Sequence, residues 1–221
     1  MHIDHVIIGA RDIGELRRLL WDRYGFGVIK GSAHADGTQG WLVPFDTPEV
    51  QYLELLTPGD MGTLAASEFG RLFLDRVPAG PAFLNWALLS DDIGKDAARV
   101  RELTGTDPRL LRGESVRPDG RRFPWAEAAF EASWQSPSRP FFLEYGNWPA
   151  RADRVAQDVA RAGHRRTPLE FGGVTLRTAR LDLPAWWEGA ALPVVVTRGH
   201  EERIEAVQVR TDDGDVEIVL P

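Results

Sequence analysis

The feature of this 221-residue chain that most constrains its fold is an internal repeat. Residues 4–8 read Asp-His-Val-Ile-Ile and align with Asn-Trp-Ala-Leu-Leu at residues 85–89. Later in each half, Tyr-Leu-Glu-Leu at residues 52–55 aligns with Phe-Leu-Glu-Tyr at residues 142–145. Because the order of the elements between these segments also matches, the repeat predicts two copies of one structural unit.

Each half predicts the element order β-α-β-β-β. In the first half, apolar residues at helical spacing from Leu16 to Tyr24 predict an amphipathic helix, with Asp12 as its N-cap and Gly25 just beyond its end. Short β-branched and aromatic runs predict the strands. The predicted strands are residues 3–8, 26–29, 41–45 and 50–56 in the first half and 83–89, 110–116, 123–132 and 140–145 in the second, whose helix is predicted at 93–103.

The rest of the chain is less regular. One helix is predicted in the connector at 58–81, a turn at 117–121, a helix or extended linker at 148–163, strands at 172–183, 194–197, 204–210 and 216–220, and a hairpin turn at 211–215. We therefore predict an α+β fold in three parts. Residues 1–80 form the first unit and connector, residues 81–150 the second unit, and residues 151–221 a C-terminal β-rich extension whose element order resembles a degenerate third unit.

Composition excludes several classes of function. The net charge is −7, with acidic and basic residues mixed along the chain, so there is no electrostatic signature of a nucleic-acid or membrane-surface protein. The absence of cysteine excludes disulfides, thiolate catalysis and zinc fingers. No apolar run approaches membrane-spanning length, and no signal peptide is evident, so we expect a cytoplasmic protein.

The order of short motifs resembles a known superfamily. The motifs are Ile-Asp-His-Val at the start, Gly-Phe after the first helix, the Gly-rich loop that holds His34, Tyr-Leu-Glu-Leu, Trp-Ala-Leu with Ser-Asp-Asp, Arg-Pro-Asp-Gly and Phe-Leu-Glu. In this order they resemble the vicinal oxygen chelate superfamily, also called the glyoxalase and bleomycin-resistance superfamily, and within it the glyoxalase-like domains. The resemblance covers roughly the first two-thirds of the chain. It implies two paired βαβββ modules whose eight strands curl round a cavity.

The resemblance also implies a metal site. In metal-dependent relatives the first strand of a module provides a His and the last strand a Glu, which corresponds here to His5, Glu54 and Glu144. Such a set suits Fe, Mn, Ni or Zn and leaves positions for a bidentate substrate. Trp86, or its neighbour Asn85, stands where relatives place a fourth ligand, which is a departure from the pattern.

Two functions therefore stay open. One is a lyase, isomerase or dioxygenase that uses the metal, with Glu144 and His34 as candidate acid–base residues. The other is a metal-free protein of the drug-resistance type that binds or sequesters a small molecule. His34 has the alternative of being an ordinary exposed loop residue.

Aromatic residues on the predicted strands suggest a cavity for a small apolar or aromatic molecule. Trp41, Trp86 and Trp125, with Tyr52, are the candidate substrate-binding residues, and core packing is the alternative for each. Trp186 and Trp187 are expected to pack the C-terminal part. A homodimer is a reasonable expectation, because such relatives often pair modules between two chains.

The three remaining histidines are His2, His164 and His200. None lies in a patterned context, and all three are predicted to lie on the surface.

Overall fold

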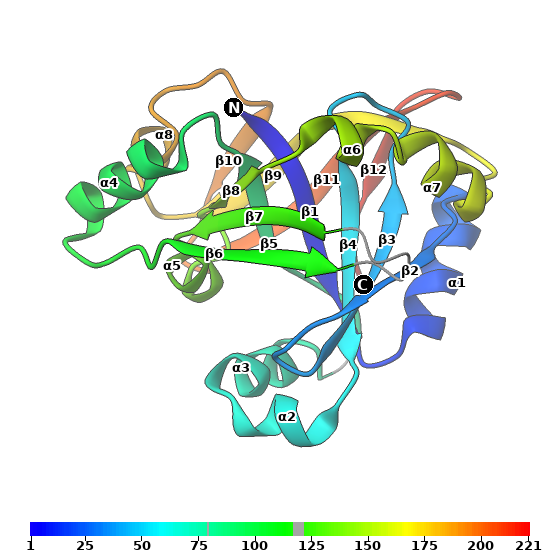
Figure 1. Cartoon of the computed structure of the whole chain (residues 1–221), viewed down its shortest axis with the longest axis horizontal. Helices are drawn as coiled ribbons and strands as arrows, with labels where there is room; N and C mark the ends of the chain where they lie inside the picture. The colour runs from blue at the N-terminus through cyan, green and yellow to red at the C-terminus, as the bar shows by residue number, and fades with distance from the viewer. Residues whose placement is uncertain (79, 117–121) are drawn as a thin grey trace.

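Two β-sheets, a large curled one and a smaller one packed behind it, organise the chain (Figure 1). The computed structural model describes residues 1–78, 80–116 and 122–221. The large sheet has eight strands in the order β2-β3-β4-β1-β5-β8-β7-β6, and the small one has four in the order β10-β9-β11-β12. The predicted α+β class and curled mixed sheet are confirmed. The predicted turn at 117–121 lies outside the described residues.

The first half forms a βαβββ module. Its elements are β1 (His2–Gly9), α1 (Ile13–Tyr24), β2 (Ile29–Ala33), β3 (Thr38–Pro44) and β4 (Tyr52–Pro58). The helix limits match their sequence signals, because the Asp12 side chain accepts a hydrogen bond from the Gly14 amide and Gly25 ends α1 in the left-handed conformation, at φ 76°. The last strand, β4, returns to pair in parallel with β1.

The second half repeats the module and joins the first through antiparallel pairing of β1 with β5. Its elements are β5 (Ala82–Leu89), α4 (Ile93–Thr104), β6 (Leu111–Val116), β7 (Arg122–Ala128) and β8 (Phe141–Tyr145). The strand predicted at 123–132 is too long, because Ala129 adopts a left-handed conformation, at φ 65°, and the chain continues as helix α5 (Phe130–Gln135). One turn of that helix brings Phe130 and Trp134 onto the same side, where both join an apolar cluster.

The connector between the modules contains two helices, α2 (Met61–Ala66) and α3 (Glu68–Arg76), where one was predicted. Ser67 divides them, because it ends the first and its side chain caps the Gly70 amide of the second. No helix among the described residues is long and apolar enough to cross a membrane.

The C-terminal part begins with helices α6 (Trp148–Ala152) and α7 (Val155–Ala162). The second sheet then comprises β9 (Pro168–Thr178), β10 (Val194–Arg198), β11 (Arg203–Thr211) and β12 (Val216–Ile218), with α8 (Leu183–Trp186) between its first two strands. This β-α-β-β-β order matches the modules, but the pairing differs. Strand β9 pairs in parallel with β10, the next strand along the chain, whereas β1 pairs in parallel with β4, the last strand of its module.

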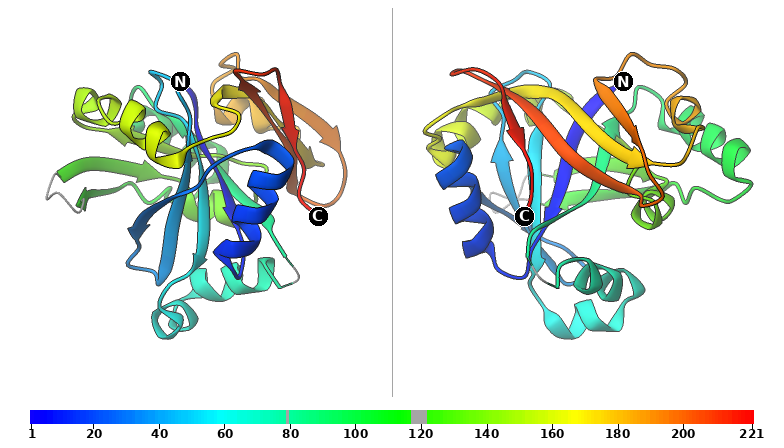
Figure 2. Two further views of the ribbon diagram at one scale, coloured as in Figure 1. Left: turned by 90° about the vertical axis from the view of Figure 1, so that its right-hand side faces the viewer. Right: turned by 180° about the vertical axis from the view of Figure 1, so that it is seen from behind.

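The large sheet has a different core on each face. Its convex face packs on α1, α4 and the C-terminal sheet, which lies between those helices in the right-hand view of Figure 2. Trp186 and Trp187 are buried in this core, as predicted. The concave face carries a smaller apolar cluster with α3 and α5, beside a polar region described below. Because both faces are covered, apolar residues alone do not reveal which side chains face the concavity.

His164 is a partly buried tether and not the surface residue that the sequence predicted. Its Nδ1 accepts a hydrogen bond from the Gly27 amide at 3.0 Å, so its Nε2 carries the proton and donates to the Pro44 carbonyl, also at 3.0 Å. Burial lowers the pKa of His164, because the charged imidazolium is poorly solvated there. The tether therefore requires the neutral ring.

This tether predicts a pH dependence of stability. Since the pKa of His164 is lower in the folded chain than in the unfolded one, the unfolded chain binds more protons between the two values. The contribution is complete above the unfolded pKa, about 6.5, and is lost as pH falls toward the folded value. Urea denaturation between neutral and mildly acidic pH should show a smaller pH dependence for His164→Asn than for the wild type. Parallel profiles would contradict the assignment.

Candidate functional site

A bulge in β1 brings two consecutive ionisable residues together. The register between β1 and β5 shifts between Ile3 and His5, so Asp4 is the extra residue in its strand. The two side chains touch, with His5 Nδ1 at 2.8 Å from Asp4 Oδ2, and they are 3% and 0% exposed. A buried pair of this kind fixes the orientation of the imidazole ring.

Strand β4 places Glu54 against the other nitrogen of the same ring. His5 Nε2 lies 3.3 Å from Glu54 Oε2, and that nitrogen is buried with no hydrogen-bond partner among the described residues. His34, in the loop between β2 and β3, approaches the second carboxylate oxygen of Glu54, with its Nε2 at 3.7 Å from Glu54 Oε1. The Nδ1 of His34 lies 2.9 Å from Thr38 Oγ1. The structure thus brings together three of the residues singled out in the sequence.

Arg151 of α6 stabilises the negative charge of the Asp4 carboxylate. Its guanidinium lies 2.9 Å from Asp4 Oδ1 and 3.6 Å from the centre of the Tyr145 ring. Burial by itself raises the pKa of Asp4, but the Arg151 charge and the His5 hydrogen bond outweigh it and hold that pKa below its usual range. Asp4 is therefore ionised at neutral pH, and His5 Nδ1 carries the proton that it donates to Asp4.

Two tyrosines cover this ionic pair. The Tyr52 ring stacks on the His5 ring at 4.8 Å, and its hydroxyl lies 3.4 Å from that of Tyr145, which lies 3.5 Å from Asp4 Oδ2. Burial, followed by the neighbouring acidic groups, raises the pKa of both hydroxyls. Both therefore stay protonated at neutral pH and can donate a hydrogen bond.

Strand β7 adds two residues to the same face. Trp125 pairs with Tyr145 and Glu127 with Leu143, and directly paired residues of antiparallel strands share a face. Burial, and then the charge of Glu54, raises the pKa of Glu127. Sequence reasoning missed Glu127, although the Trp-Ala-Glu alternation at 125–127 puts it on the face predicted for Trp125.

Glu144 lies elsewhere. Its Oε2 accepts a hydrogen bond from the Ile93 amide at 3.1 Å, in the first turn of α4. Leu143 and Tyr145, on either side of it, join the concave cluster, so Glu144 points to the convex side. The structure does not bring Glu144 together with His5 and Glu54, and its carboxylate instead stabilises the N-terminus of a helix.

Two of the predicted substrate-binding residues also lie on the convex side. Trp86 is fully buried there, with its ring centre 5.9 Å from that of Trp187. Trp41 pairs with Leu55, a convex-side residue, and its indole N–H donates to Thr57 Oγ1 at 3.1 Å. Tyr52 and Trp125 are the two that share the face of Glu54.

On β5, His5 is opposite Ala87, and the side-chain oxygen of nearby Asn85 accepts a hydrogen bond from the Ser133 hydroxyl. As the sequence indicated at Trp86 and Asn85, the first strand of the second module provides no titratable group. Within residues 1–78, 80–116 and 122–221, no three or more His, Asp or Glu side chains form a ready-made metal cluster. The arrangement instead places one imidazole nitrogen of His5 against one carboxylate oxygen of Glu54.

Comparison with known proteins agrees with this fold. The model of the glyoxalase-like domain family matches residues 3–191. The structure of a hypothetical protein from Staphylococcus aureus has a TM-score of 0.63 at 14% identity and covers 93% of this chain and 89% of that one. No curated protein matches the sequence.

Two methylmalonyl-CoA epimerases are more distant in structure. The enzyme from Mycobacterium tuberculosis has a TM-score of 0.40 at 17% identity, covering 65% of this chain and 86% of its own. The enzyme from Streptomyces coelicolor, in complex with 2-nitronate-propionyl-CoA, has a TM-score of 0.44 at 21% identity, covering 66% and 96%. The family match over residues 3–191, together with the paired βαβββ modules, shows that this chain belongs to the glyoxalase-like domains of the vicinal oxygen chelate superfamily.

Proposed function

We propose that this protein is an enzyme that uses a divalent metal ion, held by His5 and Glu54, to chelate two adjacent oxygens of a small substrate. The observation that carries the proposal is the approach of His5 Nε2 to Glu54 Oε2 at 3.3 Å in a buried setting. Since the proton of His5 is on Nδ1, facing Asp4, the nitrogen that faces Glu54 has a lone pair. Two such electron-rich atoms repel each other unless a cation or a proton lies between them.

The residues present fit a metal in their chemistry. An imidazole nitrogen and a carboxylate oxygen suit Fe, Mn, Ni or Zn, and the Asp4 carboxylate behind His5 is a common outer partner of metal-bound histidines. His34, within 3.7 Å of the same carboxylate, is the third candidate ligand. The bound ion would polarise the substrate oxygens and stabilise negative charge that develops on them.

The surrounding residues have roles that follow from their environment. Arg151 keeps Asp4 ionised and so keeps the lone pair of His5 directed at Glu54. The protonated hydroxyls of Tyr52 and Tyr145 can donate hydrogen bonds to a substrate oxygen. His34, one-third exposed, stands where a proton can be exchanged with solvent.

A metal-free binding protein is the second candidate. It is favoured by the aromatic wall of Tyr52, Tyr145 and Trp125 on one face of the sheet. In that case a proton, rather than a metal ion, lies between His5 and Glu54.

Metal content distinguishes the two candidates. Protein purified without chelator and dialysed separately against Fe(II), Mn, Ni and Zn should retain one equivalent of at least one metal, measured by elemental analysis. His5→Ala and Glu54→Gln should each abolish retention, because a catalytic site needs about three protein ligands. Glu144→Gln is the matched control and should retain the metal, since Glu144 contacts the Ile93 amide instead.

Chelation is tested with oxalate, which presents two adjacent oxygens. Oxalate should bind the metal-loaded wild type and not the metal-free protein, as measured by calorimetry. A wild type that retains no metal under any of these conditions, with its fold intact, would overturn the enzyme proposal in favour of the binding protein.

A further inference from the structure

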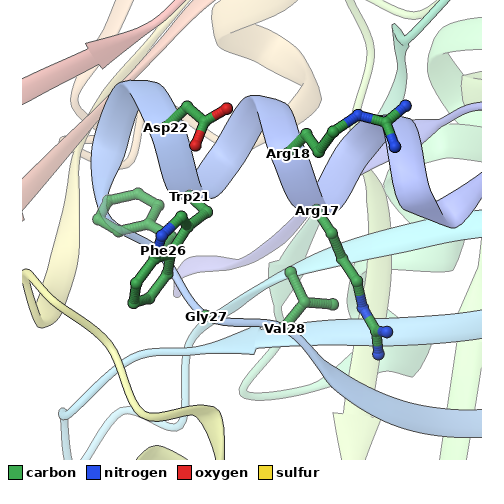
Figure 3. A pocket seen from close by; sticks show the side chains of 7 residues that line it. All are labelled: Arg17, Arg18, Trp21, Asp22, Phe26, Gly27 and Val28. Carbon is green, nitrogen blue, oxygen red and sulfur yellow. The ribbon is translucent and has the colours of Figure 1, made fainter.

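A second candidate binding site lies on the outer side of α1. A cavity of about 290 Å³ opens between this helix and the segment that follows it, residues 26–28 (Figure 3). Figure 3 shows Arg17 and Trp21 on one side of the helix, near Val28, and Arg18 and Asp22 on the other. The spacing of four residues explains why Arg17 and Trp21 share a side.

This cavity is separate from the His5–Glu54 pair. Arg17 lies 4.8 Å above the ring of Trp41, which occupies the convex side of the large sheet. Glu54 faces the concave side, so the sheet itself divides the two sites. Any binding here therefore goes beyond the proposed function.

Its aromatic surface is open. Trp21 is 41% exposed, a high value for so large an apolar side chain. Arg165, from the segment after α7, lies 5.4 Å from the centre of the Trp21 ring and donates to the Trp21 carbonyl at 3.1 Å. Arg165 thus lies over the indole, and Arg17 lines the same cavity one helical turn before Trp21.

The charge of these groups is not balanced locally. Among the described residues, no carboxylate lies within ion-pair distance of Arg17 or Arg165. Arg18 and Asp22 also line the cavity and their formal charges offset each other, so Arg17 and Arg165 leave a net positive charge beside the exposed indole. This is a local exception in a chain whose net charge is −7. Such a concentration of positive charge attracts an anion.

We propose that the cavity binds a planar aromatic anion, with its ring against Trp21 and its anionic group on Arg17, in the field of Arg165. A guanidinium binds phosphate or carboxylate through two parallel hydrogen bonds, and an indole stacks on any flat ring. Contact of Arg17 with Trp41 keeps its guanidinium oriented. The ligand needs both a flat ring and an anionic group, because a ring alone leaves Arg17 without a partner and an anion alone leaves the Trp21 ring uncovered.

Calorimetry with four probes tests the proposal. AMP and 2-naphthoate each combine a ring with an anion, whereas adenosine and inorganic phosphate each offer one half. At least one of the combined probes should bind, about tenfold or more tighter than either half probe. The tighter of the combined probes identifies phosphate or carboxylate as the natural anion.

Variants locate the binding. Trp21→Ala and Arg17→Gln should each weaken the tighter probe about tenfold, with thermal unfolding close to that of the wild type because both side chains are exposed. Arg23→Gln removes the same charge from an exposed residue of α1 that does not line the cavity, and should change affinity less than about twofold. Metal retention at His5 should be unchanged in all three variants.

Three results would overturn the proposal. One is failure of both combined probes to bind at concentrations on the order of millimolar. Another is inorganic phosphate binding as tightly as AMP, with 2-naphthoate not binding. The third is an equal loss of affinity in Arg23→Gln and Arg17→Gln. None of these results bears on the metal-content experiment.

Discussion

Replacing Arg151 with Met is expected to lower the free energy of unfolding by about 3–5 kcal/mol. The substitution leaves Asp4, which is fully buried, as an unpaired charge in the centre of the molecule. It also removes the contact of the guanidinium with the Tyr145 ring. Urea denaturation at neutral pH measures the loss.

A double variant provides the control for this prediction. Asp4→Asn combined with Arg151→Met removes both charges, so it should recover a large part of the stability lost in the single variant. An additive loss would show that the two residues are not coupled. It would then follow that Arg151 does not hold the charge of Asp4.

The same pair gives the chain an acid-sensitive component of stability. The pKa of Asp4 is lower in the folded chain than its ordinary value of 3.8. Its contribution is therefore complete above the unfolded pKa and is lost as pH falls through that value toward the folded pKa. In the double variant this component of acid denaturation should be absent.

Replacing Trp86 with Ala is expected to cost about 3–5 kcal/mol of stability without loss of metal retention. Trp86 is fully buried between the two sheets, beside Trp187, and the substitution leaves a large cavity there. If Trp86 instead contacted substrate, the main effect would be on ligand binding. Thermal unfolding and metal analysis of the same preparation separate the two outcomes.

Two further variants sharpen this assignment. Trp86→Phe should be much less destabilising than Trp86→Ala, because the indole N–H of Trp86 finds no hydrogen-bond partner among the described residues and phenylalanine retains most of the packing. Trp125→Ala, on the concave face, should weaken ligand binding while affecting stability less, since Trp125 is only partly buried. If Trp86→Ala instead weakened ligand binding and Trp125→Ala mainly lowered stability, Trp86 would be assigned to the ligand site.

The module order was predictable because it follows from local patterns and from the internal repeat. The meeting of His5 with Glu54 was expected from the family resemblance, which places a His on the first strand of a module and a Glu on its last strand. In the structure β1, which carries Asp4 and His5, pairs in parallel with β4, which carries Glu54. The caps at Asp12 and Gly25 likewise depend only on nearby residues.

The face of the large sheet on which Glu144 and Trp86 lie was not predictable in the same way. Strand β8 has Phe141, Phe142 and Leu143 in succession, and all three are buried because both faces of the sheet are covered. A continuous apolar run does not reveal which alternate residues face the site. On β5, the register shift against β1 changes the phase again, so Trp86 lies on the convex side.

The role of Arg151 depends on contacts that no local pattern contains. Arg151 and Asp4 lie 147 positions apart, and α6 belongs to neither module. Its sequence surroundings predicted only a helix or a linker. The residue became identifiable once the fold placed it against a buried carboxylate.

The most direct test of the central claim is the location of a metal ion in a crystal. Crystals grown with Zn or Mn, and measured at the absorption edge of that metal, should give an anomalous peak within about 2.0–2.3 Å of both His5 Nε2 and a Glu54 carboxylate oxygen. The peak should be absent in Glu54→Gln and present in Glu144→Gln. A wild-type crystal with no peak between His5 and Glu54, or with its peak at Glu144 instead, would contradict the account.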